Sequence, residues 1–302
     1  MSENSQLSTM EVKLTQPNLF VIGAMKAGST SLHDILNSHP SINMSKVKEI
    51  NYYSKNLAKG EEWYLSHFDF NARYAGESSV SYSRESLFPG SAKRLLSSIA
   101  NPKIIYIIRN PVDRIESDYR EHRFHNLITD RGINSFFSKG EISNTKSPAY
   151  HMFNASCYAE QLKVYKETLD RNNILILKLE DLKKDRAAVL QQVANFLDIA
   201  PFQAVPEVKS NSSTDKRQLN NRGVFMSRVF VKLNKIPFVN LTNRMLYVNF
   251  FSKEIPFEIL SKESLSLIDH QLISDLEHLN KEFDVSTEDW IEDIKKRRNS
   301  VD

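Results

Sequence analysis

The architecture of this chain can be inferred outward from the stretch Gly23-Ala24-Met25-Lys26-Ala27-Gly28-Ser29-Thr30. The stretch follows a short apolar run over residues 18–22 and precedes Leu32, Ile35 and Leu36, which have helical spacing. This pattern predicts a strand, a tight loop and a helix. Two glycines in that context are typical of a phosphate loop, where backbone N–H groups and the helix start bind an anion. The motif alone leaves an ordinary tight turn as the alternative.

Further strand-to-helix units follow along the chain. The isoleucine-rich run 103–108 leads to Asn110, a predicted N-cap, with Pro111 at the first helical position. Residues 174–179, apolar except for Lys178, form another such run, which indicates a strand covered on both faces. Helical spacing of apolar residues predicts helices within 158–169, 189–196 and 265–283. The alternation predicts an α/β fold, a phosphate-loop (P-loop NTPase-like) three-layer fold with a central parallel sheet flanked by helices.

Composition limits the domain organisation and the compartment. With 302 residues, 40% hydrophobic and 25% charged, the chain can bury the core of one large α/β domain. We expect a disordered or extended arm over 1–17, a single domain over 18–294 and a basic frayed tail over 295–302. A single cysteine, Cys157, argues against a disulfide framework. A polar start and no long apolar run predict a cytoplasmic protein without stable membrane insertion.

The charge composition does not indicate a nucleic-acid partner. The formal net charge of +3 comes from 40 basic and 37 acidic side chains. Such a balance is too even to indicate nucleic-acid binding by itself. Any anion site must therefore come from a local cluster of residues.

The glycine loop departs from that of ATP-using enzymes. Their pattern places lysine directly before the hydroxyl residue, whereas here Gly28 precedes Ser29 and the lysine is Lys26. Phosphoryl transfer also uses Mg²⁺ held by a carboxylate at a strand end, but the run 103–108 ends at Arg109. Arginine suits a site that neutralises phosphate with side chains. Metal-free sulfuryl transfer fits this pattern, because the transferred group carries less negative charge than a phosphoryl group.

Separated segments carry further motifs. They are 22–32, Tyr106-Ile107-Ile108-Arg109-Asn110-Pro111-Val112-Asp113-Arg114 with Ser117 and Tyr119, Lys48-Glu49-Ile50-Asn51-Tyr52-Tyr53, Gly76-Glu77-Ser78-Ser79, and the pairs Leu276-Glu277 and Asp289-Trp290. Together they resemble the PAPS-dependent sulfotransferases, specifically bacterial members related to the heparan sulfate sulfotransferase domain. The likeness spans roughly residues 18 to 290, so it is more specific than any one motif.

This resemblance implies the donor and the residues that bind it. The donor would be PAPS (3′-phosphoadenosine 5′-phosphosulfate) and the product PAP, with no metal required. The loop would bind the 5′-phosphosulfate through Lys26, Ala27, Gly28, Ser29, Thr30 and Ser31. Arg109 would clamp the 3′-phosphate in a forked contact, and the Ser117 hydroxyl would add a donor. Lys26 could place its ammonium on the bridging oxygen as the nucleotide leaves.

Glu49 is the candidate general base, because a carboxylate within reach can take the proton of an attacking alcohol. The alternative is that Glu49 simply pairs with Lys48, whose charge could instead raise the local positive potential. His122 and His125 are alternative bases in a segment, 121–155, that is expected to be an irregular lid or partly disordered.

The sequence does not identify the acceptor. Ser78 and Asn51 stand where some polysaccharide sulfotransferases have lysine and histidine, which weakens an assignment to heparan sulfate itself. We expect transfer to a hydroxyl, with an amine second, of a carbohydrate or small molecule; the oligomeric state is undetermined. The alternatives are an ATP-dependent kinase or nucleotidase, and a non-catalytic nucleotide-binding or membrane-surface protein suggested by the basic, apolar stretch 222–251.

Overall fold

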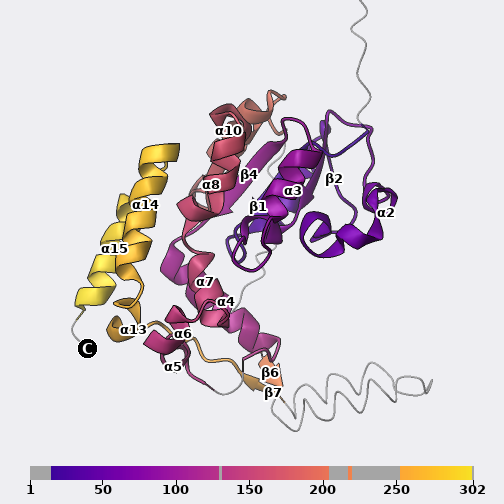
Figure 1. Cartoon of the computed structure of the whole chain (residues 1–302). Coiled ribbons are helices and arrows are strands. Elements are labelled where there is room, and N and C mark those ends of the chain that lie inside the picture. The colour runs from indigo at the N-terminus through magenta and orange to yellow at the C-terminus, as the bar shows by residue number, and fades with distance from the viewer. Residues whose placement is uncertain (1–14, 129–130, 204–216, 220–251, 301–302) are drawn as a thin grey trace, which may run out of the picture. The chain divides into compact units, whose positions relative to one another are not determined.

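The computed structural model describes residues 15–128, 131–203, 217–219 and 252–300 (Figure 1). They belong to two compact units. The described residues within 1–24, 28–107 and 162–208 form unit 1, and those within 25–27, 108–161 and 209–302 form unit 2. The chain passes between the units within the glycine loop, and the single-domain organisation stays a prediction. Most of the N-terminal arm and the stretch 222–251 lie outside the described residues.

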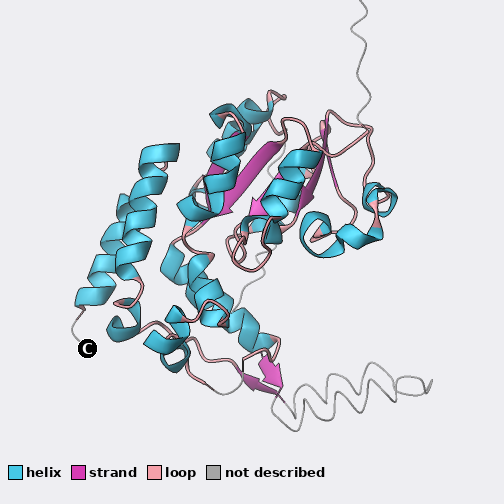
Figure 2. Ribbon diagram, viewed as in Figure 1, coloured by secondary structure: helices cyan, strands magenta, loops and turns pink. Residues whose placement is uncertain are grey.

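Unit 1 is built on a five-stranded sheet with the order β2-β3-β1-β4-β5 (Figure 2). Its strands are β1 Leu19–Gly23, β2 Ile42–Met44, β3 Tyr74–Ser78, β4 Lys103–Ile108 and β5 Ile174–Lys178. β1 pairs in parallel with β3 and with β4, and β2 pairs in parallel with β3. The predicted central parallel sheet is therefore confirmed. β2 and β3 were not predicted, because one is short and the other contains Gly76 and Glu77.

Helices cover the sheet and bury its apolar side chains. Unit 1 contains α1 Ser29–Leu36, α2 Glu61–Leu65, α3 Ser91–Ser98, α9 Leu179–Lys184 and α10 Arg186–Leu197, and it shares α8 Tyr158–Thr168 with unit 2. One core joins α1 and α10 to the strands through Leu19, Val21, Leu32, Ile35, Ile105, Ile107, Leu177, Val189 and Val193. Each fully buried large apolar side chain contributes about 1.5–3 kcal/mol relative to exposure. In Figure 1, α3 crosses the sheet in front of the strands.

The strand order determines where a ligand would bind in unit 1. β1 is in the middle, with β2 and β3 on one side of it and β4 and β5 on the other, so the strand order reverses beside β1. In such sheets, ligands bind beyond the carboxyl ends of the strands where the order reverses. The loop that follows β1 at Gly23 lies at that point.

Unit 2 is mainly helical. It contains α4 Pro111–Phe124, α5 Ile133–Phe136, α6 Lys139–Ser143, α7 Pro148–Asn154, α13 Lys262–Leu265, α14 Asp269–Phe283 and α15 Glu288–Asn299, with β6 Arg217–Leu219 antiparallel to β7 Ser252–Glu254. Asn110 caps α4 as predicted, since its side chain accepts from the N–H groups of Val112 and Asp113. The segment 121–155 is more regular than expected, because Ser147 caps α7 with Pro148 in its first turn.

The C-terminal residues differ from the expected frayed tail. The boundary drawn at residue 294 falls inside α15, which lies beside α14 (Figure 1). Arg297 pairs with Asp113 of α4 at 2.6 Å, and Arg298 pairs with Asp269 of α14 at 3.0 Å. These ion pairs place the basic residues in structure up to Asn299.

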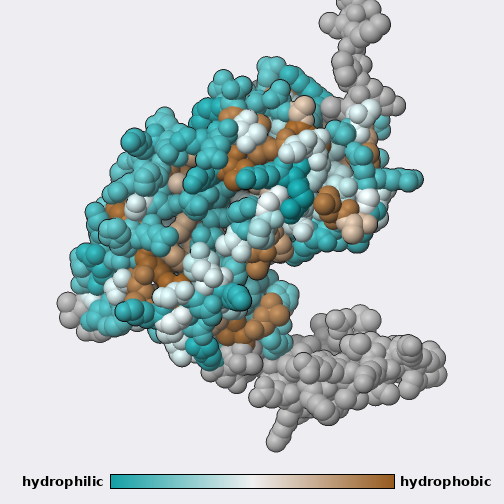
Figure 3. All heavy atoms as spheres, in the orientation of Figure 1, coloured by the Kyte–Doolittle hydropathy of each residue, from teal (hydrophilic) through white to brown (hydrophobic). Residues whose placement is uncertain are grey.

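Polar residues dominate the surface drawn in Figure 3, where hydrophobic residues form small separate groups. Within the described part of the chain, every helix is too short or too polar to cross a membrane.

Candidate functional site

The glycine loop has the backbone that an anion site needs. Lys26 and Gly28 have φ of 67° and 93°, in the left-handed region. The positive φ favours glycine at position 28, where an added Cβ would also lie 2.7 Å from Leu179 Cδ1. Within the described residues, nothing accepts a hydrogen bond from the backbone N–H groups of residues 27–31. These unpaired donors at the start of α1 can bind an anion.

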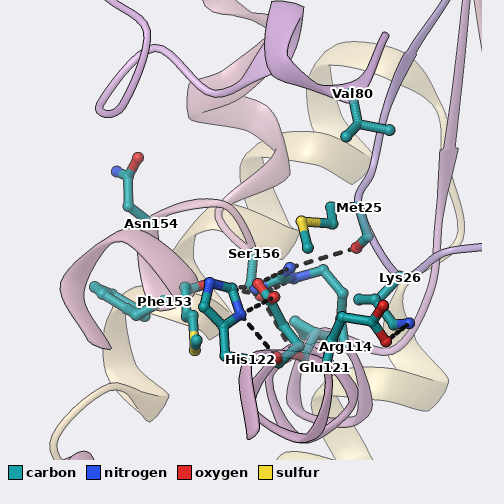
Figure 4. Close-up of polar contacts among 12 residues, drawn as sticks. Met25, Lys26, Val80, Arg114, Glu121, His122, Phe153, Asn154 and Ser156 are labelled. Carbon is teal, nitrogen blue, oxygen red and sulfur yellow. Dashed lines mark hydrogen bonds and ion pairs between the residues drawn. The ribbon is translucent and has the colours of Figure 1, made fainter. Parts of the chain in front are cut away.

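Two arginines of unit 2 hold the carbonyl groups on the first half of the loop. Arg114 Nη1 donates to the Met25 carbonyl at 3.4 Å, and Arg109 Nη1 donates to the Lys26 carbonyl at 3.4 Å. Figure 4 shows the Arg114 guanidinium directed toward Met25. Consecutive carbonyl oxygens are therefore turned toward fixed positive charge.

Arg114 is the best anchored of these residues. Its side chain has 0% exposure. It also donates to Asp118 Oδ2 at 3.0 Å, to Ser156 Oγ at 2.5 Å and to the carbonyl of Met152. A buried guanidinium is tolerated only with such partners. No role for Arg114 was predicted, because burial of an arginine has no local signal in the sequence.

Lys26, the predicted catalytic lysine, forms an ion pair with Glu121 of α4. Its Nζ lies 2.8 Å from Glu121 Oε2, and both side chains are 21% exposed. The other oxygen, Oε1, is 3.2 Å from His125 Nε2. One turn earlier, Asp118 Oδ1 is 3.1 Å from His122 Nδ1. Each histidine proposed as an alternative base is thus bound to a carboxylate of its own helix.

Arg109, the predicted phosphate clamp, has weak contacts to its neighbours. Its Nη2 is 3.4 Å from Asp113 Oδ2, and Arg297 binds the other oxygen of the same carboxylate at 2.6 Å. Among the described residues, the buried Nε of Arg109 has no hydrogen-bond partner. Its backbone is held, since the Tyr158 hydroxyl donates to the Arg109 carbonyl at 2.7 Å. Ser117 lies half-buried farther along α4.

Glu49, the predicted base, lies in unit 1 with Lys48 and Ser29. Lys48 Nζ is 3.1 Å from Glu49 Oε1 and 3.3 Å from Ser29 Oγ. The second carboxylate oxygen accepts from the Val80 N–H at 3.2 Å. Lys48 therefore connects the Glu49 carboxylate to the first residue of α1. The pair formed with Lys48 is the alternative that the sequence left open, and it does not exclude a role as base.

The Glu49 turn has a strained backbone held by hydrogen bonds. Glu49 and Asn51 are non-glycine residues with φ of 58° and 53°. Asn51 Nδ2 donates to the Glu49 carbonyl at 2.7 Å, and the Asn51 N–H donates to Ser79 Oγ at 2.9 Å. Such strain persists only where the surrounding contacts maintain it.

The Ser79 hydroxyl that binds Asn51 also binds Glu77, whose carboxylate is wholly buried. It accepts from the hydroxyls of Ser79 at 2.6 Å, Tyr64 at 2.6 Å and Tyr82 at 3.0 Å. Burial raises the pKa of Glu77 to about 7, although the three hydroxyls oppose that rise. Glu77 and Ser79 belong to one of the sequence motifs, but no function was predicted for them.

The predicted residues fall into two sets, each within its own unit. Unit 2 contains Lys26, Ala27, Arg109 and Ser117; unit 1 contains Gly28, Ser29, Thr30, Ser31 and Glu49. Ser29 is buried, whereas Thr30 is exposed at the start of α1.

This chain is similar to known proteins over much of its length. The family model described as the sulfotransferase domain matches residues 16–236, more than half of the chain. Among curated proteins, the membrane-associated sulfotransferase kil1 of Dictyostelium discoideum is 39% identical over 111 residues, which are 35% of this chain and 23% of that protein. The bifunctional heparan sulfate N-deacetylase/N-sulfotransferase 1 of Caenorhabditis briggsae is 27% identical over 205 residues, 63% of this chain and 23% of that protein. The match thus covers about a quarter of the length of these relatives.

A solved structure shows the same fold. The sulfotransferase from Alicyclobacillus acidocaldarius superimposes with a TM-score of 0.64 at 21% identity, covering 92% of this chain and 99% of that one. At this identity the likeness concerns the fold alone.

Proposed function

Because this chain belongs to the sulfotransferase domain family, we propose that it transfers a sulfuryl group from PAPS to a hydroxyl of a carbohydrate or small-molecule acceptor. The observation that carries the proposal is the loop after β1. Its N–H groups over 27–31 have no acceptor among the described residues, while arginines hold the two preceding carbonyls. A loop whose N–H groups are available and whose carbonyl groups are bound elsewhere suits a phosphosulfate group.

In the proposed reaction, the loop residues 26–31 hold the 5′-phosphosulfate and Lys26 stabilises charge on the leaving phosphate. Fixed positive charge at the place where negative charge develops lowers the barrier. Arg109 binds the 3′-phosphate, helped by Ser117. The weak contacts of Arg109, at 3.4 Å, support this assignment because a forked phosphate contact would replace them at little cost.

Glu49 acts as the base that takes the acceptor proton. Its side chain is 34% exposed, so an acceptor can reach the carboxylate. The Val80 N–H and the Lys48 ammonium orient its oxygens. The attacking oxygen then displaces the nucleotide in line, and positioning supplies much of the rate. An amine acceptor is the second possibility, and it has support in the N-sulfotransferase named above.

Two measurements test the proposal. Calorimetry with PAP should detect binding to the full chain without added metal. Incubation with sulfur-labelled PAPS and a panel of sugars and phenols, in the presence of a chelator, should label at least one acceptor. Absence of PAP binding would end the proposal, and transfer that requires Mg²⁺ and ATP would favour the kinase alternative.

A further inference from the structure

We propose that Glu121 is a positioning residue that holds the Lys26 ammonium before the donor binds and releases it when the donor enters. This inference rests on the proposed function, because it concerns the same loop. It assigns a role to a residue outside the nucleotide-binding set.

The first observation is the contact itself. The Lys26 ammonium and the Glu121 carboxylate are 2.8 Å apart, with 21% of each side chain exposed (Figure 4). Glu121 uses one oxygen for Lys26 and the other for His125, at 3.2 Å. The carboxylate is therefore oriented on both sides, and partial burial reduces the screening of the pair by solvent.

The second observation is that the backbone of the loop is anchored independently of this pair. Arg114 binds the carbonyl of Met25, and its side chain is fully buried among its own partners. The lysine stem has rotatable bonds and a compact ammonium. Lys26 can therefore change partners by side-chain rotation while the loop keeps its conformation.

Glu121 and the donor both carry negative charge that attracts the Lys26 ammonium. The donor is a polyanion, and the same ammonium cannot interact at full strength with both the carboxylate and the phosphosulfate. The pair therefore competes with the donor, and the apparent dissociation constant equals the intrinsic one divided by the fraction of protein in which Lys26 is unpaired. If about nine-tenths of the protein is in the paired state, removing the pair tightens binding about tenfold.

The experiment is a double-mutant cycle read by calorimetry with PAP. The proteins are the wild-type chain, Glu121→Gln, Lys26→Met and the double variant. We expect Glu121→Gln to tighten PAP binding about tenfold in the wild-type background and less than about twofold in the Lys26→Met background. Glu141→Gln is the matched control, because it removes the same charge from α6, where Glu141 pairs with Arg131 at 3.0 Å. It should leave PAP affinity unchanged.

The outcomes separate this inference from the function on which it rests. If the wild-type chain does not bind PAP, both are wrong. If it binds PAP but Glu121→Gln binds equally or more weakly, the holding role alone is wrong. An equal gain in both backgrounds would also overturn it, since Glu121 would then act on the ligand and not through Lys26. Glu121→Ala repeats the test should the glutamine variant fold poorly.

Discussion

At the scale of single residues, Lys26 carries the greatest share of the proposed chemistry. It combines a left-handed backbone, a carbonyl bound by Arg109 and an ammonium that reaches Glu121. The left-handed φ is uncommon for a residue with a side chain and often marks a functional position.

Replacing Lys26 by alanine should lower turnover more than it weakens nucleotide binding. The ammonium acts on charge that develops as the nucleotide leaves, so we expect kcat to fall about a hundredfold while PAP affinity falls only a few-fold. Turnover is measured with the acceptor labelled in the panel assay, and affinity by calorimetry. Equal losses in both quantities would show that Lys26 only holds the ground state.

Gly28 offers a second test at this scale. An alanine at φ of 93° is strained and its Cβ would lie 2.7 Å from Leu179 Cδ1, so the loop backbone or the Leu179 side chain must shift. We expect Gly28→Ala to weaken PAP binding by about tenfold or more. Gly60→Ala is the matched control, because Gly60 has φ of 81° but nothing within 4 Å of an added Cβ. It should lose stability and keep PAP affinity; parallel affinity losses would argue against a specific role of the loop.

At the scale of elements, the turn after β2 and the end of β3 act together in unit 1. The backbone of Asn51 depends on the Ser79 hydroxyl, and that hydroxyl depends on the buried Glu77. The turn after β2 and the end of β3, which are distant in sequence, thus together position the Glu49 carboxylate.

Ser79→Ala should lower kcat about tenfold and leave PAP affinity unchanged, because it frees the Glu49 turn without touching the loop. Tyr64→Phe is the matched control: it removes another hydroxyl from Glu77, at 2.6 Å, but leaves the bond between Asn51 and Ser79 intact. Its kcat should stay near that of the wild type. If both variants lose kcat equally, the effect is one of general stability and Glu49 is not positioned in this way.

At the scale of the whole molecule, buried carboxyl groups connect folding stability to pH. Burial raises the pKa of Glu77 and of Glu116 to about 7, and that of Asp275 to about 6. In the unfolded chain these groups titrate near 4 to 5, so between about pH 4 and 7 the folded state binds more protons. Their contribution to the free energy of unfolding therefore falls as the pH rises through this window.

Glu116 offers a test of this effect. Its Oε1 accepts from the Leu260 N–H at 3.0 Å, and Arg297 lies 3.5 Å from the same oxygen. We measure the free energy of unfolding of Glu116→Gln and of the wild type in urea. The value for the variant minus that for the wild type should increase between pH 5 and pH 8 by about 1 kcal/mol or more. Glu167→Gln, an exposed change on α8, serves as the control. A difference that does not depend on pH would show that Glu116 titrates normally in the folded protein.

The sequence alone determined the features that depend on neighbouring residues. β1, the glycine loop and α1 follow from an apolar run, two glycines and helical spacing within a short stretch. The Asn110 cap is likewise confirmed, because its side chain binds N–H groups of the next turn. The family resemblance is confirmed as well, since its motifs are local patterns at separate places along the chain. The roles assigned to Lys26, Glu49 and Arg109 stay predictions.

Only the tertiary structure decided which distant groups meet. The pairing of Lys26 with Glu121, the bond from Arg114 to Met25 and the burial of Glu77 among tyrosine hydroxyls join residues that no local pattern connects. β2 and β3 also depend on their neighbours in the sheet, because strand formation in short or polar segments reflects packing more than intrinsic preference. Local propensities act over a few residues, whereas charge pairing and burial depend on how the whole chain packs.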